Sequence, residues 1–156
     1  MIQETTNLYD QYNMPRAKDA QGNLCCLWTE NIQGVSMSRR RPGVLILPGG
    51  GYQYTSSREA EPIALRFLAQ GYAAFILYYS VAPHTFPVAL REAAMAMRYI
   101  RENSERFHLD PNSVAAIGFS AGGHLCGILG TMYDCPEVAD IGPSALIRPN
   151  VLGLCY

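Results

Sequence analysis

Four short apolar runs, separated by helical patterns, constrain the fold of this chain more than any other feature of its sequence. The runs are GVLIL (43–47), YAAFILYY (72–79), VAAIGF (114–119) and VLGLCY (151–156). They are nearly continuous and lack the polar–apolar alternation of a strand with one wet face, so each is expected to be buried on both faces. Such strands are typical of a parallel sheet that helices cover on both sides.

Three segments with helical character accompany these runs. Residues 58–71 place Pro62 where a first helical turn tolerates it and Gly71 where a helix ends. Residues 87–107 carry a one-sided apolar stripe, and a third helix is expected from Ala121 to about Met132. The stripe consists of Leu90, Ala93, Ala94, Met97 and Ile100, and the charged residues expected mostly away from it are Arg91, Glu92, Arg98, Arg101, Glu102 and Glu105.

The alternation of strands and helices predicts the α/β class, with a mostly parallel sheet and helices on both of its faces. An upstream segment, NLCCLWTE (23–30), is expected to add a strand. The short polar link that follows this segment favours an antiparallel direction for it. A length of 156 residues fits a single domain over 1–156.

Composition argues against several classes of partner and location. A net charge of −1 and a pI near 6.3 give no general affinity for nucleic acid or for an anionic membrane. The one basic cluster, SRRRPG (38–43), is expected to be a solvated approach to a strand. No apolar stretch approaches about 18 residues, and the polar start lacks the layout of a signal peptide. The five cysteines are scattered without a CxxC pair, which predicts buried thiols, no zinc site and a cytoplasmic location.

A serine between two glycines lies where the third apolar run becomes a helix. Gly118-Phe119-Ser120-Ala121-Gly122 fits the pattern GxSxG, the nucleophile elbow of hydrolases built on a parallel sheet. The pattern has a steric reason, because the serine occupies a strained turn in which side chains two residues away on either side would collide. The helix that follows directs its N-terminus toward the site, where an oxyanion is stabilised.

A second loop that the same chemistry requires follows the first buried run. In LILPGGGYQ (45–53), three glycines come directly after the strand, and their missing side chains let amides approach a substrate carbonyl. An ordinary glycine-rich turn is the alternative for this loop taken alone. A dinucleotide-binding turn at Ser120 is disfavoured, because the segment does not fit GxGxxG and follows the third run instead of the first.

Three segments resemble the α/β-hydrolase esterases related to acetyl-xylan esterases and to the hormone-sensitive-lipase branch. They are PGGGY (48–52), ILYYSVAPHTFPVAL (76–90) and LDPNSVAAIGFSAGGHL (109–125), and together they cover about residues 43–130. The first resembles the oxyanion loop of that group, in which many members have His where this chain has Pro48. The resemblance implies an α/β-hydrolase fold.

The resemblance also implies roles for individual residues. Ser120 would be the nucleophile, and the amides of Gly50, Gly51 and Ala121 would bind the oxyanion. Tyr52 would lie near the mouth of a substrate pocket, although a tyrosine that only packs the loop fits the sequence equally well. A serine acyl-enzyme mechanism needs neither a metal ion nor an organic cofactor, so none is expected.

The acid and base of a catalytic triad are not evident in the sequence. In such hydrolases the order is Ser, then Asp or Glu, then His, and this chain ends 36 residues after Ser120 (156 − 120). His124 is expected to pack and hydrogen-bond beneath the serine turn, whereas His84 and His108 precede the serine, against the family order. The acids fit other roles: Asp110 is typical of a turn, and Asp134, Glu137 and Asp140 are expected on the surface.

We therefore expect a fold truncated after the strand that follows the nucleophile helix, without the strands that carry the acid and the histidine. Its exposed apolar edge at 151–156 would favour pairing with another copy of the chain. The predicted function is a serine carboxylesterase of short-chain acyl esters, acetyl first, with carbohydrates among the candidate alcohols, and the chain alone is expected to be inactive. A non-catalytic or fragmentary hydrolase-fold module, and a peptidase or thioesterase on the same fold, stay open as alternatives.

Overall fold

The four apolar runs form strands of one sheet, as predicted, but the last run, 151–156, is not buried on both faces, because it lies at the edge of the sheet and exposes Val151 and Leu154. In the computed structural model, which describes residues 1–34 and 36–156, these strands are β3 (Arg41–Leu47), β4 (Ala73–Tyr78), β5 (Leu109–Phe119) and β6 (Val151–Cys155). They pair in parallel, β4 with β3, β3 with β5, and β5 with β6. Within β3, Leu45 and Leu47 pack into one hydrophobic core, and Val44 and Ile46 pack into a second core on the opposite face. Burial on both faces is therefore the physical reason for the unbroken apolar runs of β3 and β4.

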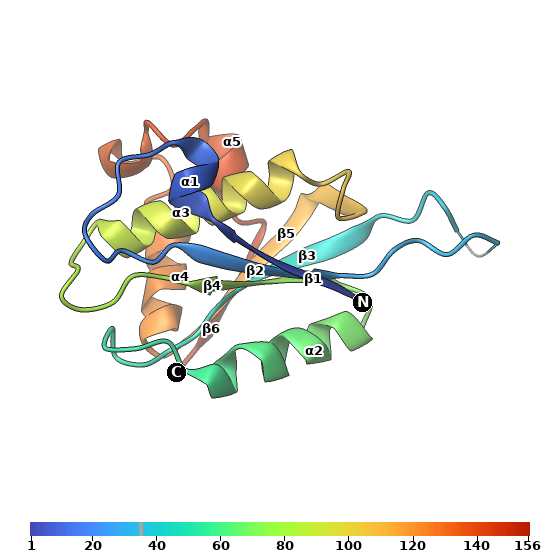
Figure 1. The fold of residues 1–156 in the computed structure, drawn as a ribbon, viewed down its shortest axis with the longest axis horizontal. Helices are drawn as coiled ribbons and strands as arrows, with labels where there is room; N and C mark the ends of the chain where they lie inside the picture. The colour runs from blue at the N-terminus through green and yellow to red at the C-terminus, as the bar shows by residue number, and fades with distance from the viewer. Residues whose placement is uncertain (35) are drawn as a thin grey trace.

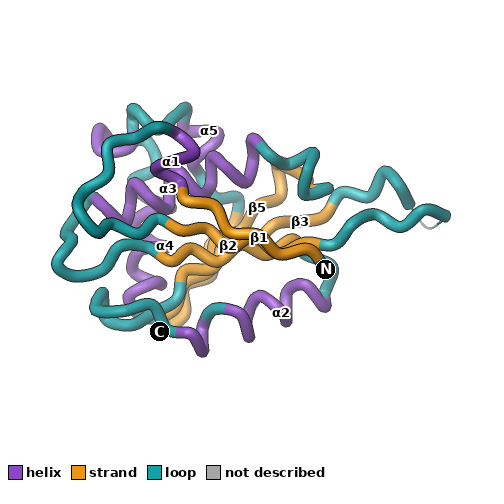
Figure 2. The backbone as a smooth tube through the Cα atoms, in the orientation of Figure 1, coloured by secondary structure: helices purple, strands orange, loops and turns teal. Residues whose placement is uncertain are grey.

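The N-terminal segment extends the sheet by two antiparallel strands. The predicted extra strand is β2 (Asn23–Trp28), which pairs antiparallel with β4. A further strand, β1 (Ile2–Asn7), and a short helix, α1 (Leu8–Tyr12), were not predicted from the sequence. The side chain of Asn7 caps this helix by accepting bonds from two backbone amides. The complete strand order is β1-β2-β4-β3-β5-β6. Figure 2 shows the strands in orange, gathered between the helices.

Helices cover both faces of the sheet, as predicted (Figure 1). Helix α2 (Glu61–Ala69) lies on one face, preceded by the short 3-10 helix η1 (Ser57–Glu59). On the other face lie α1, α3 (Val88–Glu102), α4 (Ala121–Thr131) and α5 (Ser144–Ile147), with a second 3-10 helix, η2 (Pro136–Val138), before α5. Both predicted ends of α4 agree with the structure to within one residue.

Helix α3 buries the predicted apolar stripe, but two of its charged residues depart from the prediction. All five stripe residues are buried, and so are Glu92 and Arg101, which the sequence placed mostly away from the stripe. Glu92 is fully buried because donors from distant segments satisfy its carboxylate, namely the Tyr9 hydroxyl at 2.7 Å and the backbone amide and hydroxyl of Ser80. Burial raises the pKa of this carboxyl above its ordinary value.

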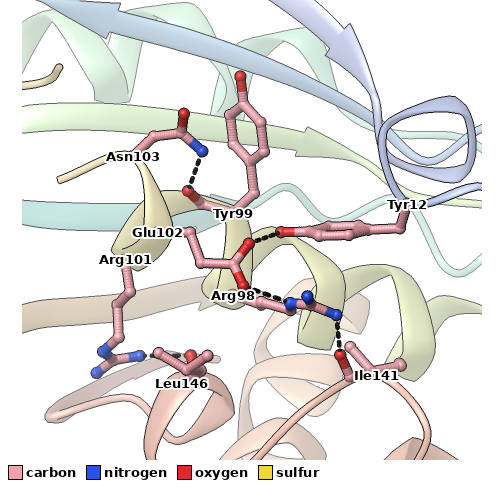
Figure 3. A network of polar contacts seen from close by, with 8 residues as sticks. All are labelled: Tyr12, Arg98, Tyr99, Arg101, Glu102, Asn103, Ile141 and Leu146. Atoms are coloured by element: carbon pink, nitrogen blue, oxygen red, sulfur yellow. Dashed lines mark hydrogen bonds and ion pairs between the residues drawn. The ribbon is translucent and has the colours of Figure 1, made fainter.

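Arg101 is buried for a comparable reason, at the opposite end of α3. Its guanidinium donates to the carbonyl oxygens of Pro111, Leu146 and Arg148 at 2.8 to 3.0 Å and to the side chain of Asn150 at 2.9 Å. Figure 3 shows the contact with Leu146 beside the bonds that join Arg98 and Glu102 to Ile141 and Tyr12. Asn150 in turn exchanges bonds with Val114. The arginine therefore fixes the segment that leads into β6.

The basic cluster also departs in part from its prediction. Arg41 is only 4% exposed, because it is the first residue of β3 and donates to the carbonyl oxygen of Glu30 at 3.2 Å. Arg40 agrees with the expectation of a solvated position and pairs with Glu105 on the surface. All five cysteines are free thiols, three of them buried and two, Cys135 and Cys155, half-buried.

Strand β6 forms one edge of the sheet and carries exposed apolar side chains. Val151 is 64% exposed and Leu154 is 60% exposed, which is unusual for a strand in a parallel sheet. Within residues 1–34 and 36–156, no helix has both the length and the apolar character needed to cross a bilayer.

Candidate active site

The carboxyl ends of β3 and β5 bring the two glycine-containing loops together. In the parallel register of these strands, Leu47 lies opposite Gly118. The loop after Leu47 contains the three consecutive glycines, and the turn after Gly118 contains Ser120. Adjacent parallel strands end at the same side of a sheet, so both loops border one site.

Ser120 occupies a backbone conformation that L-residues rarely adopt. Its φ of 51° and ψ of −116° place it between the end of β5 and the first residue of α4, and its side chain is exposed. Such a conformation costs about 1–3 kcal/mol, so the surrounding structure has to enforce it. Two backbone bonds do so: the Ser120 amide donates to the Cys155 carbonyl at 2.8 Å, and the His124 amide donates to the Ser120 carbonyl at 2.9 Å.

The two glycines that flank Ser120 are needed for steric reasons. A Cβ atom at Gly118 would lie 2.0 Å from the carbonyl oxygen of Gly122, inside the turn itself. A Cβ atom at Gly122 would lie 2.0 Å from the carbonyl oxygen of Leu47 and 2.5 Å from that of Pro48. The second contact joins the start of α4 directly to the loop after β3, so the GxSxG spacing also sets the distance between the two loops.

The loop after β3 presents backbone donors. Gly50 and Gly51 have φ values of 130° and 61°, and a Cβ atom at Gly50 would lie 2.1 Å from the carbonyl oxygen of Tyr54. Within the described parts of the chain, the amides of Gly50, Gly51 and Ala121 have no hydrogen-bond acceptor. The amide of Gly49 differs, because it donates to Glu59 Oε2 at 2.8 Å.

Ser120 and the glycine loop share one cavity of about 410 Å³. It is lined by Gly50, Gly51, Tyr54, Ser56, Arg58, Glu59, Ser120 and Tyr156, a mixed polar and apolar set, and we call it the serine cavity. Sequence reasoning placed Ser120, Gly50 and Gly51 together but did not single out Arg58 or Glu59. These two charged residues follow the three glycines closely in the sequence and lie in η1, and that nearness is a signal that could have identified them.

Tyr52 faces away from the serine cavity and lines a second one. Its hydroxyl and His124 Nδ1 are 3.0 Å apart, and its ring packs edge-on against Tyr79 with centroids 5.9 Å apart. Burial raises the pKa of the Tyr52 hydroxyl. The second cavity has a volume of about 320 Å³ and is mainly apolar; we call it the apolar cavity. It is lined by Tyr52, Ser80, His84, Thr85, Phe86, Ala89, Leu90, His124, Leu125 and Ile128.

None of the three histidines contacts the Ser120 hydroxyl. The expectation for His124 is met in part: it forms a hydrogen bond, with the Tyr52 hydroxyl, but it is exposed and not packed beneath the turn. His84 lines the apolar cavity. His108 lies at the opposite end of the sheet, where its carbonyl accepts the Arg41 amide and its Nε2 lies 2.7 Å from Glu30.

The four acidic residues considered from the sequence have roles or positions that do not involve Ser120. Asp110 accepts the backbone amide of Asn112 at 2.9 Å, the turn role predicted for it. Asp140 is exposed and pairs with Arg91, whose guanidinium holds the pKa of that carboxyl below its ordinary value. Asp134 is exposed and Glu137 is half-buried in η2. Among residues 1–34 and 36–156, no group of three or more His, Cys, Asp or Glu side chains could hold a metal ion.

Comparison with known proteins identifies relatives for most of the chain. A profile of the BD-FAE family matches residues 34–141, more than half of the sequence. The endo-1,4-beta-xylanase B of Butyrivibrio fibrisolvens is 38% identical over 128 residues, which are 75% of this chain and 19% of that protein. The acetylxylan esterase of Xylanibacter ruminicola is 30% identical over 126 residues, or 78% of this chain and 24% of that protein.

Solved structures give the same result for the fold. MGS-M1, an α/β hydrolase from a Medee basin deep-sea metagenome, superimposes with a TM-score of 0.78 at 38% identity, covering 97% of this chain and 55% of that one. The acetyl ester-xyloside bifunctional hydrolase of Caldicellulosiruptor lactoaceticus gives a TM-score of 0.71 at 32% identity, covering 83% of this chain and 46% of that one. The chain thus spans about half the length of these structures and a quarter or less of the two curated relatives.

Proposed function

The chain belongs to the BD-FAE family and has the α/β-hydrolase fold, and from that premise we propose that it is the nucleophile-bearing part of a serine carboxylesterase. The observation that carries the proposal is the strained backbone of Ser120, exposed on a cavity that it shares with the donors of the glycine loop. Strain of this kind persists where the surrounding structure enforces it, and it gathers at functional sites.

The proposed reaction proceeds through an acyl-enzyme. Ser120 Oγ adds to the ester carbonyl carbon and loses its proton to a base, while the amides of Gly50, Gly51 and Ala121 donate to the oxyanion. Collapse of this intermediate expels the alcohol and leaves the acyl group on Ser120. Water then hydrolyses the acyl-enzyme and releases the carboxylic acid. No step calls for a metal ion or an organic cofactor.

The base and its acid partner are proposed to come from outside residues 1–156. The described histidines are engaged elsewhere or line the other cavity, and hydrolases of this fold carry the acid and the histidine on later loops than the serine. We accordingly expect this chain alone to hydrolyse esters poorly, because loss of triad members costs several orders of magnitude in rate.

The proposed substrate is a short-chain acyl ester, acetyl first, with a carbohydrate as the candidate alcohol. The names of two relatives support this choice, an acetylxylan esterase and an acetyl ester-xyloside bifunctional hydrolase. The polar groups in the serine cavity support it as well, because hydroxyl-rich alcohols need hydrogen-bond partners such as Arg58.

Fluorophosphonate labelling and hydrolysis of p-nitrophenyl acetate test the proposal. Both are measured on this chain and on the gene product that carries it, with Ser120→Ala as the test variant and the exposed Ser144→Ala as the matched control. Labelling and turnover of the gene product should require Ser120 and persist in the control, with a loss of about 10³-fold or more on its removal. A gene product that stays unlabelled would contradict the serine mechanism and favour a non-catalytic module. Faster turnover of peptide or thioester substrates than of the acetate would favour the alternative chemistries.

We further propose that the β6 edge pairs with a second copy of this chain. Its backbone edge and the exposed side chains of Val151 and Leu154 support pairing with another strand. Light scattering coupled to size exclusion should show a dimer that Leu154→Lys weakens, whereas Leu65→Lys, at a comparably exposed leucine on α2, leaves it intact. A monomer at every concentration would contradict this part of the proposal.

A further inference from the structure

Glu59 is placed to control the glycine loop, although nothing in the sequence pattern drew attention to it. It ends the 3-10 helix η1, is half-buried, and lines the serine cavity with Ser120, Gly50 and Gly51. Its Oε2 accepts the backbone amide of Gly49 at 2.8 Å, and its Oε1 accepts the hydroxyl of Tyr156. A carboxylate that binds a backbone amide makes a stronger and better-directed bond than a neutral acceptor.

Gly49 is the point at which the glycine loop touches the serine turn. A Cβ atom at Gly49 would lie 2.6 Å from the carbonyl oxygen of Phe119 and 3.2 Å from Ser120 Cβ. Its carbonyl oxygen accepts the Ser56 amide at 2.9 Å, so both polar backbone groups of Gly49 are held by residues 56–59. This short segment therefore fixes the peptide plane from which the next two amides of the loop begin.

The next amides have no such partner. Those of Gly50 and Gly51 meet no acceptor among the described residues, and the Gly50 carbonyl is turned back to accept the Gln53 amide at 3.0 Å. Because Gly49 is anchored and Gly50 adopts a φ of 130°, the free amides of Gly50 and Gly51 are held at the serine cavity. Neither glycine has a side chain that would fill the space beside these amides. Donors that are fixed before the reaction cost no reorganisation when charge develops.

We propose that Glu59 is a positioning residue that aligns the oxyanion-binding amides by holding Gly49. This inference rests on the proposed esterase function, and it adds a residue that acts through the loop without touching the substrate. A fixed negative charge beside an oxyanion is unfavourable in itself. Glu59 is therefore inferred to act through geometry, so a neutral acceptor of the same shape should preserve most of its effect.

The test compares Glu59→Ala, Glu59→Gln and Glu61→Gln. Glu61 is a matched control because it lies two residues further on and accepts a tyrosine hydroxyl, that of Tyr78, at 2.6 Å, outside the serine cavity. Tyr156→Phe removes the other partner of Glu59 and separates that contact from the bond to Gly49. The readouts are hydrogen–deuterium exchange at the Gly49 amide, and kcat and KM of the gene product on p-nitrophenyl acetate.

Glu59→Ala should accelerate exchange at the Gly49 amide about tenfold, the loss of one hydrogen bond. It should lower kcat by about 10- to 100-fold with KM within about threefold, because an interaction felt only in the transition state is weakened. Glu59→Gln should stay within about fivefold of the parent in kcat, and Glu61→Gln within about twofold. Tyr156→Phe is read by exchange alone, and the Gly49 amide should exchange at the rate of the parent. An unchanged kcat in Glu59→Ala, or a Glu59→Gln variant as impaired as Glu59→Ala, would overturn the inference.

Failure of the proposed function is distinguishable from failure of this inference. If the gene product hydrolyses no ester, the esterase proposal fails, while exchange at Gly49 still reports whether Glu59 holds the loop. If the gene product is active and exchange at Gly49 does not respond to Glu59→Ala, the positioning role fails and the esterase proposal stands.

Discussion

The two cavities that residues of the glycine loop border differ in chemistry, and they have no lining residue in common. The serine cavity, about 410 Å³, contains Ser120, the free amides and two charged side chains. The apolar cavity, about 320 Å³, contains His84 and His124 among aliphatic and aromatic groups. Tyr52 directly follows Gly51, and His124 lies one helical turn after Ser120, so the two loops that border one cavity continue into the other.

The two cavities are suited to two different requirements of an enzyme that hydrolyses an ester. Stabilising a developing oxyanion needs fixed donors, which the serine cavity has, and binding a carbon chain needs apolar area, which the apolar cavity has. A cavity of about 320 Å³ is larger than an acetyl group needs. We therefore predict that the apolar cavity receives the acyl chain and that its size sets the longest chain accepted.

The largest expected effect comes from breaking the contact between the start of α4 and the loop after β3, which places Ser120 beside the serine cavity. In Gly122→Ala, the new Cβ would lie 2.0 Å from the Leu47 carbonyl oxygen, a backbone atom that cannot move away without shifting β3. We expect the free energy of unfolding to fall by about 3 kcal/mol, measured by urea denaturation. Gly127→Ala is the control on the same helix, because its Cβ would meet only Leu154 side-chain carbons at 4.0 Å. A Gly122→Ala variant as stable as Gly127→Ala would show that the two loops are not in contact as described.

The second prediction narrows the apolar cavity and leaves the serine cavity intact. Ala89 lines the apolar cavity from α3, so Ala89→Phe should occupy the space of a longer acyl chain. For the gene product, kcat/KM on p-nitrophenyl hexanoate should fall about tenfold while that on the acetate stays within about threefold. Ala139→Phe, exposed and outside both cavities, is the control. Equal losses on both esters would argue against an acyl chain in this cavity.

The third prediction concerns the contact between Tyr52 and His124, which both line the apolar cavity. Tyr52→Phe removes the hydroxyl that meets His124 Nδ1 and keeps the ring that packs against Tyr79. The free energy of unfolding should fall by about 1 kcal/mol, the net worth of one hydrogen bond. Tyr54→Phe should change it less, because Tyr54 is 58% exposed. The imidazole NMR signals of His124 should shift only in Tyr52→Phe, and if they do not, the bond is absent in solution.

The sequence predicts those parts of the molecule in which each residue's environment is set by its neighbours in the chain. The unbroken runs predicted β3 and β4 because strands buried on both faces cannot contain polar positions, and they also located β5 and β6, although β6 is exposed at the edge of the sheet. The turn at Ser120 was predicted with them, because glycines at 118 and 122 leave space that other residues would fill. Strand β1 escaped prediction because its segment IQETTN alternates weakly and lies at an edge.

Contacts between distant segments could not be predicted in this way. Glu92 looked like a solvated helix residue, since the donors that permit its burial come from Tyr9 and Ser80. Glu59 was not singled out from the sequence, since its bond to Gly49 depends on the path of the loop between them. A hydrogen bond of His124 was expected, but its partner and its exposure were not, since the partner, Tyr52, is 72 residues away. Each error concerns a polar side chain whose partner is set by the tertiary fold.

The smallest expected effect is a pH dependence of stability that arises from Glu92, next to the apolar cavity. Glu92 lies behind that cavity and holds Ser80, one of its lining residues. Burial raises the pKa of Glu92, while the bonds from Ser80 and Tyr9 and the nearby His84 oppose that shift. Because the folded-state pKa lies above that of the unfolded chain, the folded form binds more protons between the two values. The contribution of this group to the free energy of unfolding is therefore fully present below about pH 4.3 and is lost as pH rises through the folded-state pKa.

Urea unfolding of the parent and of Glu92→Gln from pH 4 to pH 7 isolates this contribution, since carboxyls with lowered pKa, such as Asp140, act equally in both proteins. The parent's advantage over the variant should shrink as pH rises, and a difference that stays constant or grows would show that Glu92 ionises as readily in the folded protein as in water.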